Sequence, residues 1–427
     1  MARWVNSAAE AVSGIRSGDT LWSHSMASTP LVLLDALAEH ARHCEGLTLL
    51  QLHLEHAYSL ADPALDGRLR CRCFFAGRET RDLINQGLAD YVPIFLSDIP
   101  RLMRSGQQRV DVAIVQVSEP DRHGNCSLGM SVEATAAACE VADRIIAHVN
   151  PNVPRTLGDG FIHVDRIDVA YREAAPLIYH EVREPGAVDS EIGARVATLV
   201  EDGACLQMGI GSIPDAALAC LGGHRELGVH TEMFSDGVLG LLESGVITNS
   251  RKKIGRGRVV TTFAMGSPAL YEFVDDNREV AFLDVEFVNS PVNIARNKQV
   301  TSINSAIQID LTGQVCADSI GHRIYSGVGG QVDFVLGAAH SEGGKSIIAL
   351  PSTARDGTVS RLVPSLAKGA GVVTTRAQVD YVVTEFGIAQ MRGRSLQERA
   401  SALLAISHPD FREELAREAR EALSLRL

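Results

Sequence analysis

Leu206-Gln207-Met208-Gly209-Ile210-Gly211-Ser212-Ile213-Pro214-Asp215 is the stretch that decides the fold. Its apolar start predicts a buried strand, and Gly209 and Gly211 predict a tight turn because neither carries a Cβ atom. A helix is expected next, with Ser212 as its N-cap and Pro214 in its first turn. A strand that turns at glycine into a helix is typical of α/β proteins, which bind ligands at such turns.

A second stretch, Leu227-Gly228-Val229-His230-Thr231-Glu232-Met233, predicts the next strand and a carboxylate just beyond its end. Ligands of open α/β sheets bind at the carboxyl ends of the strands, so we expect Glu232 and the glycine turn at one sheet edge. Glu385 also follows an apolar strand, within Val382–Gly387. Position at a strand end does not separate the two glutamates.

Three interpretations of these stretches remain open. Gly209 and Gly211 could begin a dinucleotide fingerprint with Glu232 as the ribose ligand, but Pro214 stands where the third glycine belongs. Alternatively, the glycine loop cradles an acyl group or a phosphate, and Glu232 acts as a nucleophile. A simple turn beside a solvated glutamate is equally consistent with two isolated motifs.

Composition narrows the class of protein. A chain of 427 residues predicts about two domains. Apolar residues at 45% and charged residues at 22% are typical of a folded, soluble protein. The net charge of −12 disfavours a nucleic-acid or anionic-membrane partner, and an anionic ligand would need a local basic pocket.

Targeting and metal-binding signals are missing from the sequence. It contains no 18-residue apolar run and no signal-peptide core at its start. The eight cysteines are scattered, and neither they nor the 14 histidines show metal-binding spacing. We therefore expect reduced thiols, no metal site and a cytoplasmic location.

Strand and helix patterns alternate along the chain, which predicts βαβ units and parallel sheets. A continuous apolar run predicts a strand at 112–117, for example, and another strand is expected at 144–149, with a helix at 132–142 between them. The pattern lapses at a Pro-Gly turn, where we place a domain boundary. The prediction is two open α/β domains with mainly parallel sheets, residues 1–185 and residues 186–427.

A second glycine-rich loop, Ser326–Phe334, suits close backbone approach to a phosphate or carbonyl oxygen through Gly327, Gly329 and Gly330. Lys345 could neutralise a phosphate, although an exposed lysine at a strand start is commoner.

Taken together, these motifs resemble the acetyl-CoA hydrolase/transferase family. Within it they resemble the 4-hydroxybutyrate and butyrate:acetate CoA-transferase branch of the family I CoA-transferases. The resembling segments cover nearly the whole chain: Pro120–Gly129, Val149–Thr156, Met208–Asp215, His230–Gly237, Ser302–Ser305, Gly313–Cys316, Ser326–Phe334, Gly343–Ser352 and Asp380–Gly387.

The resemblance implies that the active site lies between the two domains of the chain and that the protein is a homodimer. It implies that Glu232 becomes a glutamyl-CoA thioester and that Glu385 has a supporting role. It assigns CoA contacts to Gln207, Met208, Gly209, Ile210, Gly211, Ser212, Ile213, Asn304, Gly327, Gly329, Gly330 and Lys345.

The implied activity moves CoA between acetyl-CoA or butyryl-CoA and an acid such as 4-hydroxybutyrate, butyrate or acetate, with ping-pong kinetics. CoA is then a substrate, and no cofactor is bound permanently. The loop Ser25–Pro30 matches the family more loosely and is expected to shape the acid pocket. Alternatives are an acetyl-CoA hydrolase of the same family, a non-catalytic CoA-binding module and an NAD-dependent oxidoreductase.

Overall fold

The computed structural model describes residues 2–181, 184–209 and 211–424. It divides into two compact units, each described here by itself. The first comprises Met1–Glu181, Val260–Val288 and Ile324–Gly329; the second comprises Val182–Val259, Asn289–Arg323 and Gly330–Leu427. Because segments alternate between the units, the chain crosses from one to the other at several points.

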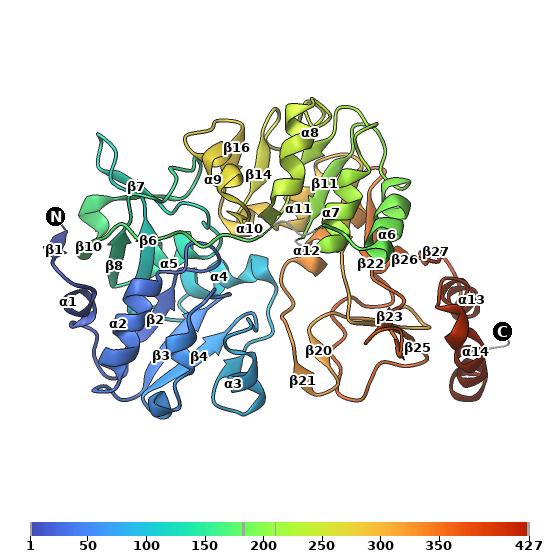
Figure 1. Cartoon of the computed structure of the whole chain (residues 1–427), viewed down its shortest axis with the longest axis horizontal. Coiled ribbons are helices and arrows are strands. Elements are labelled where there is room, and N and C mark those ends of the chain that lie inside the picture. Colours follow the sequence, from blue (N-terminus) through green and yellow to red (C-terminus); the bar gives the residue numbers. More distant parts are fainter. Residues whose placement is uncertain (1, 182–183, 210, 425–427) are drawn as a thin grey trace. The chain divides into compact units, whose positions relative to one another are not determined.

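An eight-stranded parallel sheet forms the centre of the first unit (Figure 1). In spatial order its strands are β1 (Arg3–Val5), β10 (Val169–Arg172), β8 (Arg144–Val149), β6 (Val112–Val117), β2 (Thr20–Ser23), β3 (Leu47–Gln51), β4 (Leu69–Cys73) and β5 (Asp90–Tyr91). Its helices are α1 (Ala8–Val12), α2 (Leu31–Ala41), α3 (Arg81–Asn85), α4 (Ile99–Arg104), α5 (Thr135–Val141), α9 (Pro268–Val274) and α10 (Val285–Val288). The strands predicted at 112–117 and 144–149 are confirmed.

A six-stranded sheet forms the centre of the second unit. In spatial order its strands are β12 (Gly228–Val229), β11 (Cys205–Met208), β17 (Val300–Asn304), β22 (Lys345–Ala349), β26 (Tyr381–Thr384) and β27 (Gly387–Gln390). Only the pair β26–β27 is antiparallel among these described strands. Its helices are α6 (Ala187–Ala197), α7 (Ser212–Ala219), α8 (Leu239–Glu243), α11 (Pro291–Ala295), α12 (Gln331–His340), α13 (Leu396–Ala405) and α14 (Pro409–Leu423).

Short strands lie outside the two main sheets. They are β7 (Asn125–Ser127), β9 (Phe161–His163), β13 (Met233–Phe234), β14 (Val259–Thr261), β15 (Phe263–Ala264), β16 (Val280–Phe282), β18 (Gln308–Asp310), β19 (Val315–Cys316), β20 (Ser319–Ile320), β21 (Arg323–Ile324), β23 (Thr353–Ala354), β24 (Val359–Ser360) and β25 (Leu362–Val363). The mainly parallel α/β fold predicted from the sequence is thus confirmed in both units.

Apolar packing covers both faces of the second unit's sheet. On β22, Ile347 and Ala349 pack in one cluster with residues of α6 and α7. Ile348, between them in sequence, packs in another cluster with Leu403 of α13. Successive strand residues point to opposite faces, so both faces of β22 are removed from water, as a parallel sheet requires. This packing fixes the sheet whose edge carries Glu232.

The glycine turn after β11 differs from the prediction in one detail. Helix α7 begins at Ser212, and Gly211 is its N-cap with φ +122°. The expectation that Ser212 caps the helix is therefore wrong, because the helix starts one residue earlier. Glycine suits this cap because its backbone adopts positive φ without a Cβ clash.

Within the part of the chain that the structure describes, no helix is both long and apolar enough to cross a membrane.

Candidate active site

Glu232 follows the short strand β12 and is tied to the end of β11. The N–H of His230 donates to the carbonyl of Leu206 at 3.0 Å. The Thr231 hydroxyl donates to the carbonyl of Met208 at 3.0 Å and accepts from the Met208 N–H at 3.3 Å. These bonds fix the residues before Glu232, so the carboxylate and the glycine turn lie at the same edge of the sheet.

Among the described residues, Asn289 and Gly330 donate to the carboxylate of Glu232. The side-chain nitrogen of Asn289 lies 2.8 Å from Oε2 of Glu232, and the backbone N–H of Gly330 also donates to this carboxylate. A Cβ atom at position 330 would overlap both Oε2 of Glu232 and Nδ2 of Asn289. Only glycine lets the main chain approach this closely.

Burial and hydrogen bonding act on Glu232 in opposite directions. Desolvation raises the pKa of its carboxyl group to about 7, while the hydrogen bonds from Asn289 and Gly330 lower it. Burial disfavours the charged form and donors favour it, so the net rise means that burial dominates. A carboxylate with a pKa near neutrality is both substantially ionised and more basic than an ordinary glutamate, which suits a nucleophile.

Asn289 is a site residue that the sequence reasoning missed. It stands in the short connection between α10 and α11, just before the N-cap Ser290. Its side-chain nitrogen also lies 3.4 Å from Oδ2 of Asp333, in the first turn of α12. An asparagine before a helix cap is common in turns, so nothing in the local pattern marks this one as functional.

The described residues around the glycine turn that follows β11 differ in burial. Met208 and Ile213 are buried, and Ile213 packs in the apolar cluster between α6, α7 and the sheet. Within the described residues, no atom outside the chain neighbours lies within 4 Å of the position that a Cβ of Gly209 would take. This space lets a ligand approach the main chain of the turn. Ile210 lies outside the described residues, and Ser212 is half-buried at the start of α7.

Gln207 and Asn304 form an amide pair at the ends of the neighbouring strands β11 and β17. Asn304 Nδ2 donates to Gln207 Oε1 at 3.1 Å, and Gln207 Nε2 lies 3.4 Å from Asn304 Oδ1. Both amides therefore lie at the carboxyl edge of the sheet, beside the glycine turn.

Gly327 and Gly329 belong to the first unit and pack there on the loop around Phe75. A Cβ at Gly327 would clash with the Phe75 ring. The carbonyl of Ser326 accepts from Ala76, and that of Gly329, whose φ is +56°, accepts from Leu96, both at 3.1 Å. Their predicted role as CoA contacts stays a prediction.

Lys345 is not brought together with Glu232. It is the first residue of β22, so it stands at the amino ends of the parallel strands, whereas Glu232 stands at the carboxyl ends. Its ammonium lies 2.6 Å from Oε1 of Glu201 and 2.9 Å from the carbonyl of Leu199. This ion pair explains the lysine structurally, and its CoA contact stays a prediction.

Glu385 holds a loop. Its Oε1 accepts from the Ser352 hydroxyl at 2.5 Å and its Oε2 from the Ser352 N–H at 2.9 Å. Both carboxylate oxygens are therefore used to fix the chain after β22. The geometry gives Glu385 a supporting contact and leaves Glu232 as the candidate nucleophile.

The possible metal ligands and the cysteines of the described residues do not form a second candidate site. No three His, Cys, Asp or Glu side chains of the described residues are arranged to hold a metal ion, and the expectation of no metal stays a prediction. All eight cysteines are free, and only Cys220 is exposed.

Comparisons with known proteins agree with this architecture. The model of the acetyl-CoA hydrolase/transferase N-terminal domain matches residues 2–178, and that of the C-terminal domain matches residues 266–419. The chain is 46% identical to a 4-hydroxybutyrate coenzyme A transferase of Clostridium kluyveri, over 96% of each chain. It is also 46% identical to a succinyl-CoA:acetate/propanoyl-CoA:succinate CoA transferase of Fasciola hepatica, over 99% of this chain and 89% of that protein.

The crystal structure of RipA from Yersinia pestis superimposes with a TM-score of 0.93 at 37% identity, over 98% of this chain and 97% of RipA. Similarity of this extent, across both matched domains, establishes the relationship. The chain belongs to the acetyl-CoA hydrolase/transferase family.

Proposed function

We propose that this protein is a CoA-transferase that moves CoA between a short-chain acyl-CoA and a carboxylic acid by way of a thioester on Glu232. The observation that carries the proposal is the Glu232 carboxylate, held by the Asn289 amide and the Gly330 N–H beside a glycine turn. Membership of the family and the CoA-transferase relatives support it.

The reaction proceeds by exchange of acyl bonds. An oxygen of the Glu232 carboxylate attacks the acyl-CoA carbonyl carbon, the C–S bond breaks, and a mixed anhydride and CoA thiolate form. The thiolate then attacks the Glu232 carbonyl and releases the first acid as its carboxylate, which leaves a glutamyl-CoA thioester. The acceptor carboxylate attacks this thioester, and the same steps run in reverse, which gives ping-pong kinetics.

Asn289 and Gly330 stabilise the negative charge that develops on the Glu232 carbonyl oxygen during the reaction. When thiolate or acceptor attacks the Glu232 carbonyl, its oxygen becomes an oxyanion, and both donors already contact this carboxylate. Preorganised donors of this kind typically contribute roughly 10²–10³ in rate each. The backbone of Gly209 provides close contact for the acyl-CoA, because no described atom other than those of its chain neighbours lies within 4 Å of the position that a Cβ of Gly209 would take.

For substrates we propose acetyl-CoA or butyryl-CoA as donor and 4-hydroxybutyrate, butyrate or acetate as acceptor. A panel of acceptor acids tests this choice, and it fails if succinate exceeds every monocarboxylate by about tenfold in kcat/KM. The same panel without an acceptor measures hydrolysis. Hydrolysis as fast as transfer would make the protein an acetyl-CoA hydrolase instead.

We propose further that the enzyme is a cytoplasmic homodimer of two-domain chains, divided at residues 185 and 186, and that it binds no cofactor permanently. The family resemblance supports these points. Light scattering of the purified chain tests the dimer, because a monomer at working concentration would contradict it. Mass spectrometry of the native protein tests for a retained cofactor.

A further inference from the structure

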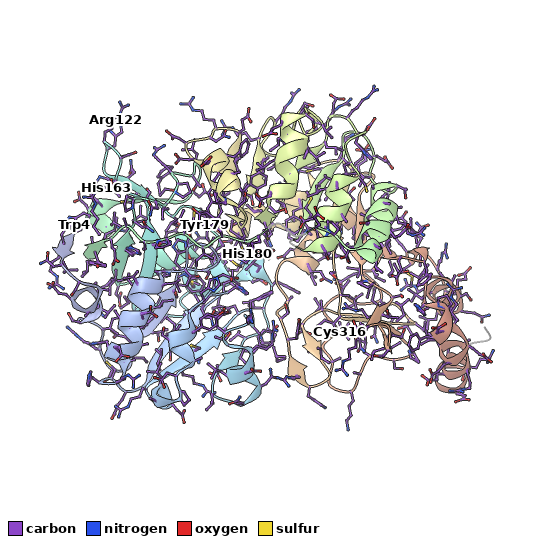
Figure 2. All side chains as sticks on the ribbon, viewed as in Figure 1. Trp4, Arg122, His163, Tyr179, His180 and Cys316 are labelled. Carbon is purple, nitrogen blue, oxygen red and sulfur yellow. The ribbon has the colours of Figure 1, made fainter. Side chains whose placement is uncertain are left out.

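A cavity of about 440 Å³ lies in the second unit, away from the residues that contact Glu232. One wall is the turn of the β18–β19 hairpin, with Thr312 and Gln314. Cys316, labelled in Figure 2, follows this turn on β19. The loop that contains Ser365, Lys368 and Arg376 also lines the cavity. A volume of this size is typical of small-molecule sites.

Two cations and one carboxylate line the cavity. Lys368 and Arg376 line it, and neither side chain has an ion-pair or hydrogen-bond partner among the described residues. Arg399 lies beneath the hairpin turn, 9% exposed, and donates to backbone carbonyls of Thr312, Arg376 and Arg394. Its pKa is lowered by burial and, to a smaller extent, by the nearby Arg376 charge.

The one acidic side chain that lines the cavity is already satisfied. Oδ1 of Asp310 accepts from the Thr312 N–H, the Thr312 hydroxyl and the Gln314 N–H, at 2.9, 2.6 and 3.0 Å. Oδ2 accepts from the Gln314 side chain at 2.6 Å. Asp310 thus holds the hairpin turn, and two cations, Lys368 and Arg376, line the cavity with this one engaged carboxylate in a protein whose net charge is −12.

We propose that this cavity binds a phosphate-bearing organic anion. A guanidinium group matches phosphate oxygens through paired N–H donors, and two cations in one cavity favour a multiply charged phosphate over a monocarboxylate. The Ser365 hydroxyl is a polar group suited to the rest of such a ligand, whereas the Thr312 hydroxyl and the Gln314 side-chain nitrogen already donate to Asp310. The phosphate belongs either to the nucleotide part of CoA or to a free nucleotide.

The cavity is also linked to the active site by a short path within the second unit. Thr374, two residues before Arg376, accepts from the Gln331 side chain at 3.0 Å. Gln331 directly follows Gly330, whose N–H contacts Glu232. A ligand that orders the 365–376 loop therefore bears on the start of α12.

Calorimetry on the full chain tests the inference with three probes: CoA, ATP and pantetheine, which lacks phosphate. In the double variant Lys368→Gln/Arg376→Gln, affinity for a phosphate probe is expected to fall by about tenfold or more for each cation lost. Pantetheine binding is expected to stay unchanged. Arg296→Gln, an exposed arginine of the same unit without a described ion pair, is the matched control.

Ser365→Glu, at an exposed position of the cavity wall, is a second variant that adds a carboxylate without removing a contact of the fold. Loss of CoA affinity identifies the substrate's own phosphates as the ligand, and loss of ATP affinity alone identifies a free nucleotide. The inference is overturned if both variants bind CoA and ATP within about twofold of wild type, or if Arg296→Gln loses as much. Repeating the titrations in Glu232→Gln separates this result from the role of Glu232.

Discussion

The side-chain nitrogen of Asn289 lies 2.8 Å from Oε2 of Glu232, although the two residues are 57 positions apart in sequence. Asn289 and Gly330 are each the first residue of a segment that returns to the second unit from the first. Both donors to the carboxylate therefore come from points where the chain crosses between units. The basicity of Glu232 depends on these two crossings as well as on its own strand.

Replacement of Asn289 by leucine is expected to lower the transfer rate by roughly 10²–10³, because one preorganised donor to the oxyanion is lost. The pKa of Glu232 should also rise above about 7, since the hydrogen bond from Asn289 lowers it. The measurement is kcat/KM against pH. A lower rate with an unchanged profile would show that Asn289 does not act on the Glu232 carboxylate.

For the wild-type enzyme, kcat/KM for the acyl-CoA is expected to fall as the pH drops below about 7. Attack needs the ionised carboxylate, and burial raises the pKa of Glu232 to about 7. The profile of kcat/KM reports groups of the free enzyme, so it should lose about tenfold per pH unit on the acid side. Activity that is constant down to about pH 5 would contradict the assignment.

Glu232→Gln is expected to stabilise the fold at neutral pH. A carboxyl group whose pKa rises from 4.5 to about 7 on folding favours the folded state fully below pH 4.5, and this contribution is lost as the pH rises through 7. The glutamine side chain does not ionise, so the variant does not lose this stability. The difference in free energy of unfolding between the variant and wild type should therefore grow between pH 4.5 and 7. At pH 8 it reaches at most about 3 kcal/mol, and less because Glu232 is partly accessible.

Urea unfolding of wild type and Glu232→Gln at pH 4.5 and pH 8 measures this difference. Equal free energies of unfolding at pH 8 would mean that the carboxylate is well solvated in the folded protein. Because the two proteins differ at one residue, the effects of all other titrating groups cancel when their free energies of unfolding are subtracted at each pH.

Gly209→Ala and Gly222→Ala form a matched pair. At both positions a Cβ meets no described atom within 4 Å, and neither glycine has a positive φ. Both variants should therefore fold with little change in melting temperature. Only Gly209→Ala should raise KM for the acyl-CoA, because its added methyl group occupies the space beside the turn. Equal KM values for the two variants would exclude close approach of the substrate to Gly209.

The sequence predicts those strands in which apolar side chains follow one another. The strands Val112–Val117 and Arg144–Val149 have the bounds predicted for them. The first is a continuous apolar run, which is typical of a buried parallel strand. Strand β17, Val300–Asn304, was missed although it lies inside the second sheet. Its Thr301 and Ser302 interrupt the apolar run, and tertiary pairing rather than local preference makes it a strand.

For the candidate active site, the sequence predicts the residues that stand at the carboxyl ends of strands. Glu232 and the Gly209 turn could be placed together because parallel strands bring their carboxyl ends to one edge. Asn289 could not, because its contact depends on how the chain returns to the second unit. Lys345 was predicted as a CoA contact, but its ammonium forms an ion pair with Glu201, which is 144 positions away and cannot be read from the linear sequence. The division of the chain between residues 185 and 186 stays a prediction. The first compact unit also contains residues 260–288 and 324–329, which lie in the second half of the sequence.

Covalent trapping tests the central claim most directly. Wild-type enzyme is incubated with acetyl-CoA, treated with borohydride, digested and analysed by mass spectrometry, with Glu232→Gln and the exposed-residue variant Glu243→Gln treated in parallel. Borohydride reduces a glutamyl thioester to an alcohol, so the peptide containing Glu232 should change mass in wild type and Glu243→Gln and remain unchanged in Glu232→Gln. A mass change on Glu385, or an unmodified Glu232 in enzyme that is turning over, would contradict Glu232 as the nucleophile.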